Sequence, residues 1–175
     1  MDFQPKDYYE AASDRMDQAD LLYSLAAEYC QGLEDRRYAW VVYSAGLAVE
    51  CMLRAYIRRV TNKFSSRHDL SRLFVESRLD TRVVEHLGKQ GYDAGSPVVV
   101  ERLTRLYAAA GVVARIWRNN YRFASDGVLI RDFLDRKVVR ARDNKGAKAQ
   151  VLRKQAHLLL LGAGTIIKAG KEAWT

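Results

Sequence analysis

The sequence predicts an all-α fold, an up-and-down bundle of four to five helices, for three reasons. Hydrophobic residues make up 49% of the 175 residues and there are only two prolines, a composition that favours packed helices over disorder. Apolar residues recur at three- and four-residue steps along most of the chain. Residues 39–57 form a nearly continuous apolar run around which other helices can pack. At this length residues 1–175 form one domain with a full core.

The apolar run predicts the central helix. Ser44, Glu50 and Arg54 are its only clearly polar residues, and the acid stands four positions before the base, the favourable order for an intrahelical pair. The run has the length of a membrane span, but these charges and the arginines beyond both ends favour a buried helix and argue against a membrane. A buried glutamate must be paired or hydrogen-bonded. Glu50 and Arg54 therefore form either an internal polar tie or the floor of a site.

The remaining elements follow in order. Residues 6–33 have an apolar side and a polar side, and the polar break at 34–37 makes a hairpin with the central helix. A short helix capped by Ser66 or Asp69, another at 80–89, and a longer one from Pro97 to about residue 117 come next. Residues 126–147 form a basic, less regular segment, a short helix or a hairpin. The last helix spans about 147–173, with a core face of Leu152, Leu158, Leu159, Leu161, Thr165, Ile166 and Ala169.

Cysteine and histidine patterns predict neither a disulfide nor a metal site. Cys30 and Cys51 would be offset by roughly 15 Å in the hairpin, so both are expected to be free thiols, which suits a reducing compartment. The three histidines are scattered, without zinc-ligand spacing, and no cofactor motif is visible. The first residues do not resemble a secretory signal, so we expect a cytoplasmic protein.

The charge distribution favours an anionic partner. The formal net charge is +8, and residues 131–154 hold nine lysines and arginines against three aspartates. A solvated linker could have this composition, but so could a surface that contacts a phosphate backbone. The residues expected to contact nucleic acid are Arg118, Tyr121, Arg122, Arg136, Lys137, Arg140, Arg142 and Lys145. Because no base-reading motif accompanies them, binding should be weakly sequence-selective and strongly salt-dependent.

Three pieces of the sequence, taken together, resemble a known family. They are AGLAVECMLRA at residues 45–55, RHDL at 67–70 and WRNNYRF at 117–123. Their order and spacing resemble the HEPN family (higher eukaryotes and prokaryotes nucleotide-binding). The resemblance implies a helical bundle that forms a homodimer, with a site where the two copies meet. Many members are metal-independent ribonucleases of toxin–antitoxin or phage-defence systems, and members often pair with a nucleotidyltransferase.

The ribonuclease motif of the family is an arginine, often followed by a polar residue, with a histidine a few positions later. Arg118 and Asn119 match its start, but Phe123 stands at the histidine position and cannot transfer a proton. The resemblance therefore implies a module that binds RNA, a nucleotide or a partner protein, with Arg118 and Arg122 beside Glu50.

Two alternatives remain open. The first is a divergent ribonuclease that uses Arg118, Asn119 and Arg122, with His68 or a tyrosine recruited across the dimer. The family role of His68 looks structural, however, because Asp69 would cap the next helix and Leu70 would enter the core. The second alternative is a structural subunit of a larger complex.

Overall fold

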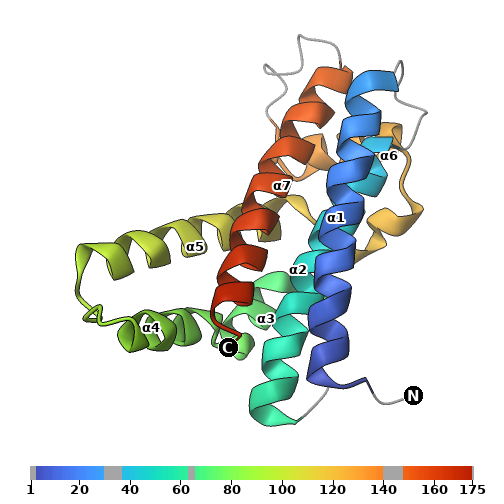
Figure 1. Ribbon diagram of the computed structural model, residues 1–175. Helices are drawn as coiled ribbons and strands as arrows, with labels where there is room; N and C mark the ends of the chain where they lie inside the picture. Colours follow the sequence, from blue (N-terminus) through green and yellow to red (C-terminus); the bar gives the residue numbers. More distant parts are fainter. Residues whose placement is uncertain (1–2, 30–36, 63–65, 140–147, 175) are drawn as a thin grey trace.

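The computed structural model describes residues 3–29, 37–62, 66–139 and 148–174, and within these ranges the chain is helical without strands. Figure 1 shows the arrangement. The elements are α1 (Pro5–Tyr29), α2 (Arg37–Thr61), α3 (Leu70–Ser77), α4 (Leu79–Lys89), α5 (Pro97–Ile116), the 3₁₀ helix η1 (Asn119–Phe123), α6 (Asp126–Asp135) and α7 (Lys148–Glu172). The predicted all-α class is confirmed.

Three long helices form the body of the bundle. In Figure 1, α1 rises while α2 and α7 descend beside it, and α5 crosses behind α7 at a steep angle. The helices approach closely where glycine leaves room. A Cβ on Gly162 of α7 would stand 3.1 Å from a methyl of Val113 and 3.3 Å from the carbonyl oxygen of Ala109, both on α5. This glycine therefore serves helix packing.

Helix α2 is the central helix. Most of its residues are buried, including Val49, Met52 and Tyr56, each at most 1% exposed. The helix is long and apolar enough to cross a membrane by length and composition, but 78% of its most apolar window is buried inside the structure. That burial is the property expected of a core helix, and α1, α3 and α7 all pack against it.

The structure settles one alternative left open by the sequence and corrects one core assignment. Residues 126–135 form a helix, α6, which settles the choice between a short helix and a hairpin for that part of the segment. The placement of Leu161 on the core face of α7 was wrong, because its side chain is 57% exposed while Leu160 is 6% exposed. Residues 158–161 are all leucine, so apolar residues occur on every side of the helix in this turn. The apolar pattern therefore could not show which of the two leucines is buried.

The N-terminus of α2 is capped by a residue far away in the sequence. Asp126, the first residue of α6, is fully buried, and its carboxylate accepts hydrogen bonds from the backbone N–H groups of Ala39 (2.7 Å) and Tyr38 (3.4 Å). A carboxylate is favourable here because the first N–H groups of a helix lack intrahelical partners and face the positive end of its dipole. Asp126 thereby ties the basic segment to the central helix.

Candidate functional site

A buried polar centre lies in the middle of α2. Glu50 is 4% exposed and Arg54 is 8% exposed, and an Arg54 NH2 group lies 2.9 Å from a Glu50 carboxylate oxygen. Arg54 also donates to the backbone carbonyl oxygen of Arg67, at 2.9 Å. Because a buried carboxylate is stable only when it is paired, this contact explains how the central helix tolerates Glu50. The pair also joins α2 to the loop that precedes α3.

His68 completes this centre. Its Nδ1 lies 3.0 Å and 3.1 Å from the two carboxylate oxygens of Glu50, while its side chain remains 47% exposed. Since a carboxylate can only accept, Nδ1 must hold a hydrogen. The same nitrogen is 3.5 Å from the Arg54 guanidinium, a separation between two donors rather than a hydrogen bond. Glu50 therefore fixes the imidazole with Nε2 available for proton transfer or ligand contact.

The RHDL turn has the local structure that its residues predict. The Asp69 carboxylate accepts from the backbone N–H groups of Ser71 (3.0 Å) and Arg72 (3.3 Å), so it is the N-cap of α3. Leu70 is buried in the core at 6% exposure. The cap and the buried leucine together fix the backbone on either side, which holds His68 against α2.

The chain leaves α5 through a tight contact with α2. The Trp117 indole Nε1 donates to the carbonyl oxygen of Tyr43 at 3.2 Å. The indole ring lies so close to Gly46 that a Cβ there would stand 1.9 Å from a ring carbon, well inside van der Waals contact. Gly46 is thus required by the close approach of the indole. This contact places the next residue, Arg118, beside α2.

After Trp117 the chain presents a cationic and aromatic surface, which we call the η1 surface: Arg118, Asn120, Arg122 and Phe123, all exposed. The Arg122 guanidinium lies over the Phe123 ring, 4.7 Å from its centre, and Phe123 is 74% exposed. Among the described residues, neither the Arg118 nor the Arg122 side chain makes a hydrogen bond or an ion pair. Exposed guanidinium groups beside an exposed ring can hold phosphate and stack on a base.

Tyr121 and Arg136 have structural roles, which differs from the expectation that they contact nucleic acid. Tyr121 is 4% exposed, and its hydroxyl hydrogen-bonds the Asp132 carboxylate. Arg136 also contacts that carboxylate, at 2.6 Å, and donates to the carbonyl oxygens of Arg115 (2.8 Å) and Ile116 (2.9 Å) at the end of α5. A cation there satisfies carbonyls that have no intrahelical partner.

These contacts shift two pKa values. Burial, with the hydrogen bond to Asp132, raises the pKa of Tyr121. Burial acts to raise the pKa of Asp132 as well, but the hydrogen bonds from Tyr121 and Arg136, with the positive charges of Arg136 and Arg118, outweigh it and hold that pKa below its usual value. Arg118 is therefore near enough to act on Asp132 electrostatically while its own side chain remains exposed.

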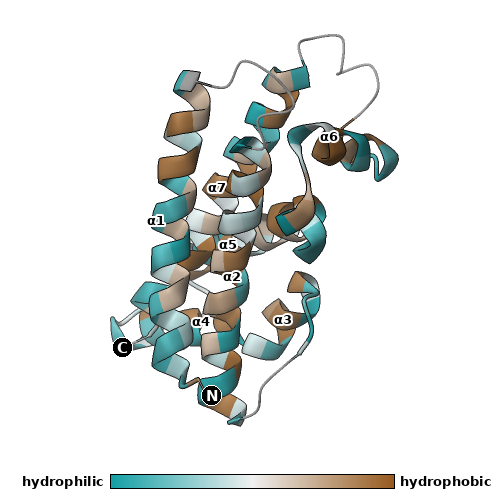
Figure 2. Ribbon diagram, turned by 90° about the vertical axis from the view of Figure 1, so that its right-hand side faces the viewer, coloured by the Kyte–Doolittle hydropathy of each residue, from teal (hydrophilic) through white to brown (hydrophobic). Residues whose placement is uncertain are grey.

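The η1 surface and the buried polar centre of Glu50, Arg54 and His68, called the Glu50 centre below, lie along one side of α2. Tyr43, Gly46, Glu50 and Arg54 are spaced so that they share a helix face, and Gly46 and Glu50 are about 6 Å apart along the axis. In Figure 2, α3 and α6 lie on the same side of α2, one above the other, and η1 leads into α6. Within the described residues no hydrogen bond or ion pair joins Arg118 or Arg122 to Glu50, whose partners are Arg54 and His68.

The remaining predicted contacts belong to the basic segment. Lys137 is exposed just after α6, and Arg131 is exposed on that helix. Arg140, Arg142 and Lys145 lie outside the described residues, as does Cys30. Cys51 is a free thiol, and burial raises its pKa to about 11. Among the described residues, no group of three or more histidine, cysteine, aspartate or glutamate side chains could hold a metal ion.

Comparison with known proteins identifies the family. A family model described as the HEPN domain matches residues 6–110, more than half of the chain. The chain belongs to the HEPN family. A HEPN domain is a nucleotide-binding or ribonuclease-like module, and this is the class of function that membership indicates. No curated protein and no solved structure matches the chain.

The HEPN match divides the site in two. Glu50, Arg54 and His68 lie inside the matched residues, whereas the η1 surface lies beyond their end. The contact between Glu50 and His68 was not predicted from sequence, although both residues belong to pieces that resemble the family. The sequence did indicate that Glu50 has a second partner, since a buried glutamate needs more than one hydrogen-bond donor. The separation of 18 positions gave no means to choose the second donor.

Proposed function

We propose that this HEPN domain is a non-catalytic module that binds single-stranded RNA, or a nucleotide as the smallest such ligand, through the η1 surface. The observation that carries the proposal is the exposed Arg122–Phe123 pair beside Arg118, with no carboxylate engaging either arginine among the described residues. Base stacking on an aromatic ring contributes about 1–3 kcal/mol per base and tolerates any sequence. The guanidinium groups supply the phosphate contacts that such a surface needs.

Phe123 fits this role better than it fits catalysis. It stands where the ribonuclease motif has a histidine, and a phenyl ring cannot accept or donate a proton. A ring that is 74% exposed loses contact with water when a base stacks on it, which favours binding. Phe123 therefore excludes acid–base catalysis at this position and supplies a ring on which a base can stack.

Fluorescence anisotropy with a labelled oligouridylate in low salt tests the proposal. Replacing both Arg118 and Arg122 by alanine should weaken binding and flatten its salt dependence, because two phosphate contacts account for about 1.4 units of the slope of log K against log salt. Phe123→Ala should weaken binding while leaving that slope unchanged.

The matched control is Arg105→Ala. Arg105 is an exposed arginine of α5 that pairs with Glu101, so its loss should have little effect on RNA affinity. Equal RNA affinity in the double arginine variant and in Arg105→Ala would sink the proposal.

A second candidate function, a divergent ribonuclease, is favoured by one observation: Glu50 orients His68 so that Nε2 is free to move a proton. In that reaction Nε2 accepts the proton of a ribose 2′-hydroxyl, and the oxygen attacks the adjacent phosphorus. The bond to the 5′-oxygen breaks, that oxygen takes a proton, and a 2′,3′-cyclic phosphate remains. Arg118 would stabilise the negative charge on the phosphate oxygens.

Incubation with total RNA in the presence of a chelator separates the two functions. The ribonuclease predicts cleavage that His68→Gln and Arg118→Ala abolish and Arg105→Ala retains. The binding module predicts intact RNA with all four proteins, including the unaltered one. Variants of Glu50 are unsuitable, since removing the carboxylate leaves the buried Arg54 charge without its ion pair, a loss of about 3–5 kcal/mol in stability.

The same proposal includes a cellular setting, supported by the resemblance of residues 45–55, 67–70 and 117–123. We place the domain in a homodimer in the cytoplasm, within a prokaryotic toxin–antitoxin or phage-defence system, with a nucleotidyltransferase or another defence protein as partner. Native mass spectrometry of the purified complex tests this setting. A dimer or larger complex is expected, and a monomer that binds no second protein would contradict it.

A further inference from the structure

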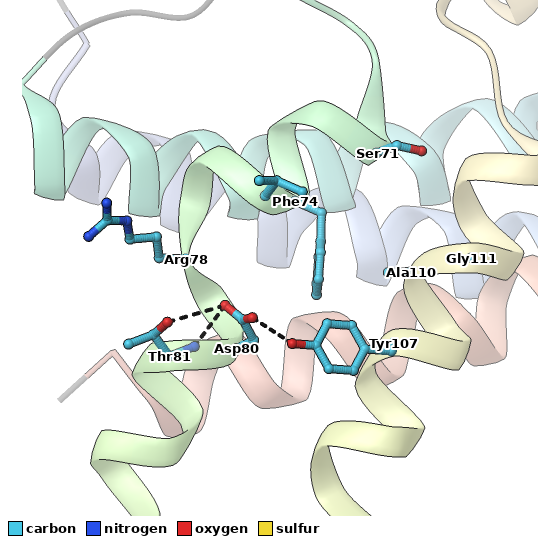
Figure 3. Close-up of a pocket in the computed structure, with 9 residues that line it drawn as sticks. Ser71, Phe74, Arg78, Asp80, Thr81, Tyr107, Ala110 and Gly111 are labelled. Carbon is cyan, nitrogen blue, oxygen red and sulfur yellow. Dashed lines mark hydrogen bonds between the residues drawn. The ribbon is translucent and has the colours of Figure 1, made fainter.

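A cavity of about 520 Å³ lies between α3, α4 and α5, apart from the residues discussed so far. Figure 3 shows it with Phe74 reaching down from α3, Tyr107 reaching across from α5, and Asp80 on α4 at the hydroxyl end of the tyrosine ring. Ala110 and Gly111 of α5 form part of the lining. The volume is in the range of sites for small organic ligands, which are mostly apolar with a few fixed polar groups.

The polar group of this cavity is a carboxylate held in place by its neighbours. Asp80 accepts from the backbone N–H of Thr81 at 2.8 Å, from the Thr81 hydroxyl at 3.5 Å and from the Tyr107 hydroxyl at 2.6 Å (Figure 3). The hydrogen bond to Asp80, with a smaller effect of burial, raises the pKa of Tyr107, so the phenol remains a donor. A carboxylate offers about four acceptor positions. One position is open on the oxygen that accepts from Tyr107, and the Thr81 hydroxyl, at 3.5 Å, holds a position on the other oxygen only weakly, so a ligand donor can take its place.

The aromatic side chains provide a surface for a flat ring. Tyr107 is 50% exposed and Phe74 lies against it edge to face, with ring centres 5.8 Å apart. The tyrosine ring is fixed at its far end by the bond to Asp80, so stacking on it costs little side-chain freedom. In Figure 3 the Arg78 guanidinium points away from both rings, so Asp80 is the charged group of the cavity that faces the ring surface.

We propose that this cavity binds a guanine base, an inference that rests on the proposed function because it names the base that the RNA or nucleotide ligand presents here. A fixed carboxylate beside an aromatic face suits a planar ring with two adjacent N–H donors. Guanine has such donors at N1 and at the 2-amino group, and it stacks on tyrosine. Adenine places an acceptor at N1, which faces a carboxylate unfavourably.

Titration of the ¹⁵N-labelled protein with nucleosides tests the inference, because nucleosides have no phosphate to bind the η1 surface. Guanosine should shift the amide signals of Tyr107 and Gly111, with affinity about fivefold or more above that of adenosine. Inosine retains the N1 donor and lacks the 2-amino group, so its affinity should fall between the two.

Two substitutions locate the binding. Asp80→Asn removes the carboxylate and should abolish the preference for guanosine. Gly111→Leu should block the cavity without touching Asp80, and Gly111→Ala is its matched control, since a Cβ at Gly111 meets nothing within 4 Å. Equal binding of guanosine and adenosine, the absence of shifts with guanosine, or guanosine affinity equal in the leucine and alanine variants would each overturn the inference.

The result is distinguishable from that for the η1 surface. Oligouridylate contains no guanine, so its binding is predicted to depend on Arg118 and Arg122 and to be unaffected by Gly111→Leu. Absence of a preference for guanosine, together with intact oligouridylate binding, would contradict only the proposed guanine site. Absence of oligouridylate binding, together with intact guanosine binding, would contradict only the proposed role of the η1 surface.

Discussion

At the scale of single residues, the site depends on a few groups that satisfy several needs at once. Glu50 needs partners because it is buried, and one of those partners, His68, is thereby oriented toward solvent. Trp117 needs a partner for its indole N–H and finds it in the carbonyl oxygen of Tyr43. Gly46 makes that approach feasible by having no side chain. The identity of each residue follows from the neighbour it must accommodate.

Gly46→Ala tests this reading of the indole contact. The added methyl would overlap the Trp117 ring, so we expect a loss of about 1–3 kcal/mol in the free energy of unfolding, as for other overpacked cores. Displacement of Trp117 should also move Arg118 and weaken RNA binding. Urea denaturation measures the first effect and anisotropy the second.

Gly111→Ala is the control for the glycine substitution itself. Its Cβ meets nothing within 4 Å, so the change should raise stability by up to about 1 kcal/mol, the difference in helix propensity. If Gly46→Ala were as stable as Gly111→Ala, the indole would not be closely packed against α2 and the account of how Arg118 is positioned would fail.

At the scale of elements, α6 is the part of the fold that the sequence predicted least well. Its buried residues, Asp126, Leu129, Ile130 and Phe133, share one face. The sequence hides this face, because one of its members is an aspartate and the apolar Val128, which is 42% exposed, lies outside it. The long helices were predictable because each buries a single stripe. An aspartate that caps a helix 87 positions away leaves no local signal.

Asp126→Ala should therefore destabilise the whole fold rather than α6 alone. Two buried N–H groups of α2 would lose their acceptor, at a cost of about 1–3 kcal/mol. Chemical denaturation followed by circular dichroism measures the change. Asp126→Asn retains one acceptor oxygen, so its stability should lie between those of the unaltered protein and Asp126→Ala. If Asp126→Ala were as stable as the unaltered protein, α2 would not depend on this cap.

The candidate site illustrates the same limit of sequence reasoning. Arg118 and Arg122 could be selected because the motif and the charge both pointed to them. Tyr121 and Arg136 satisfied the same criteria, yet they bond to Asp132 and to the end of α5. Charge and residue type do not reveal which cations are engaged by the fold. The cavity beside Asp80 was missed entirely, since it brings together residues of three helices.

At the scale of the whole molecule, the two proposed ligand surfaces divide the recognition of RNA between charge and shape. The chain has a net charge of +8, which draws anions toward it without regard to sequence. The η1 surface adds fixed contacts for phosphate and a stacking ring, and the cavity beside Asp80 adds a preference for one base. Binding without the cavity would be insensitive to sequence, and binding without the η1 surface would depend less steeply on salt.

The most direct test of the central claim is the affinity for oligouridylate, measured by anisotropy from low to physiological salt, with Arg118 and Arg122 both replaced by alanine. The account predicts weaker binding and a salt slope that falls by about 1.4 units, with Arg105→Ala indistinguishable from the unaltered protein. An unchanged slope in the double variant, or an equal loss in Arg105→Ala, would contradict the claim that the η1 surface binds RNA.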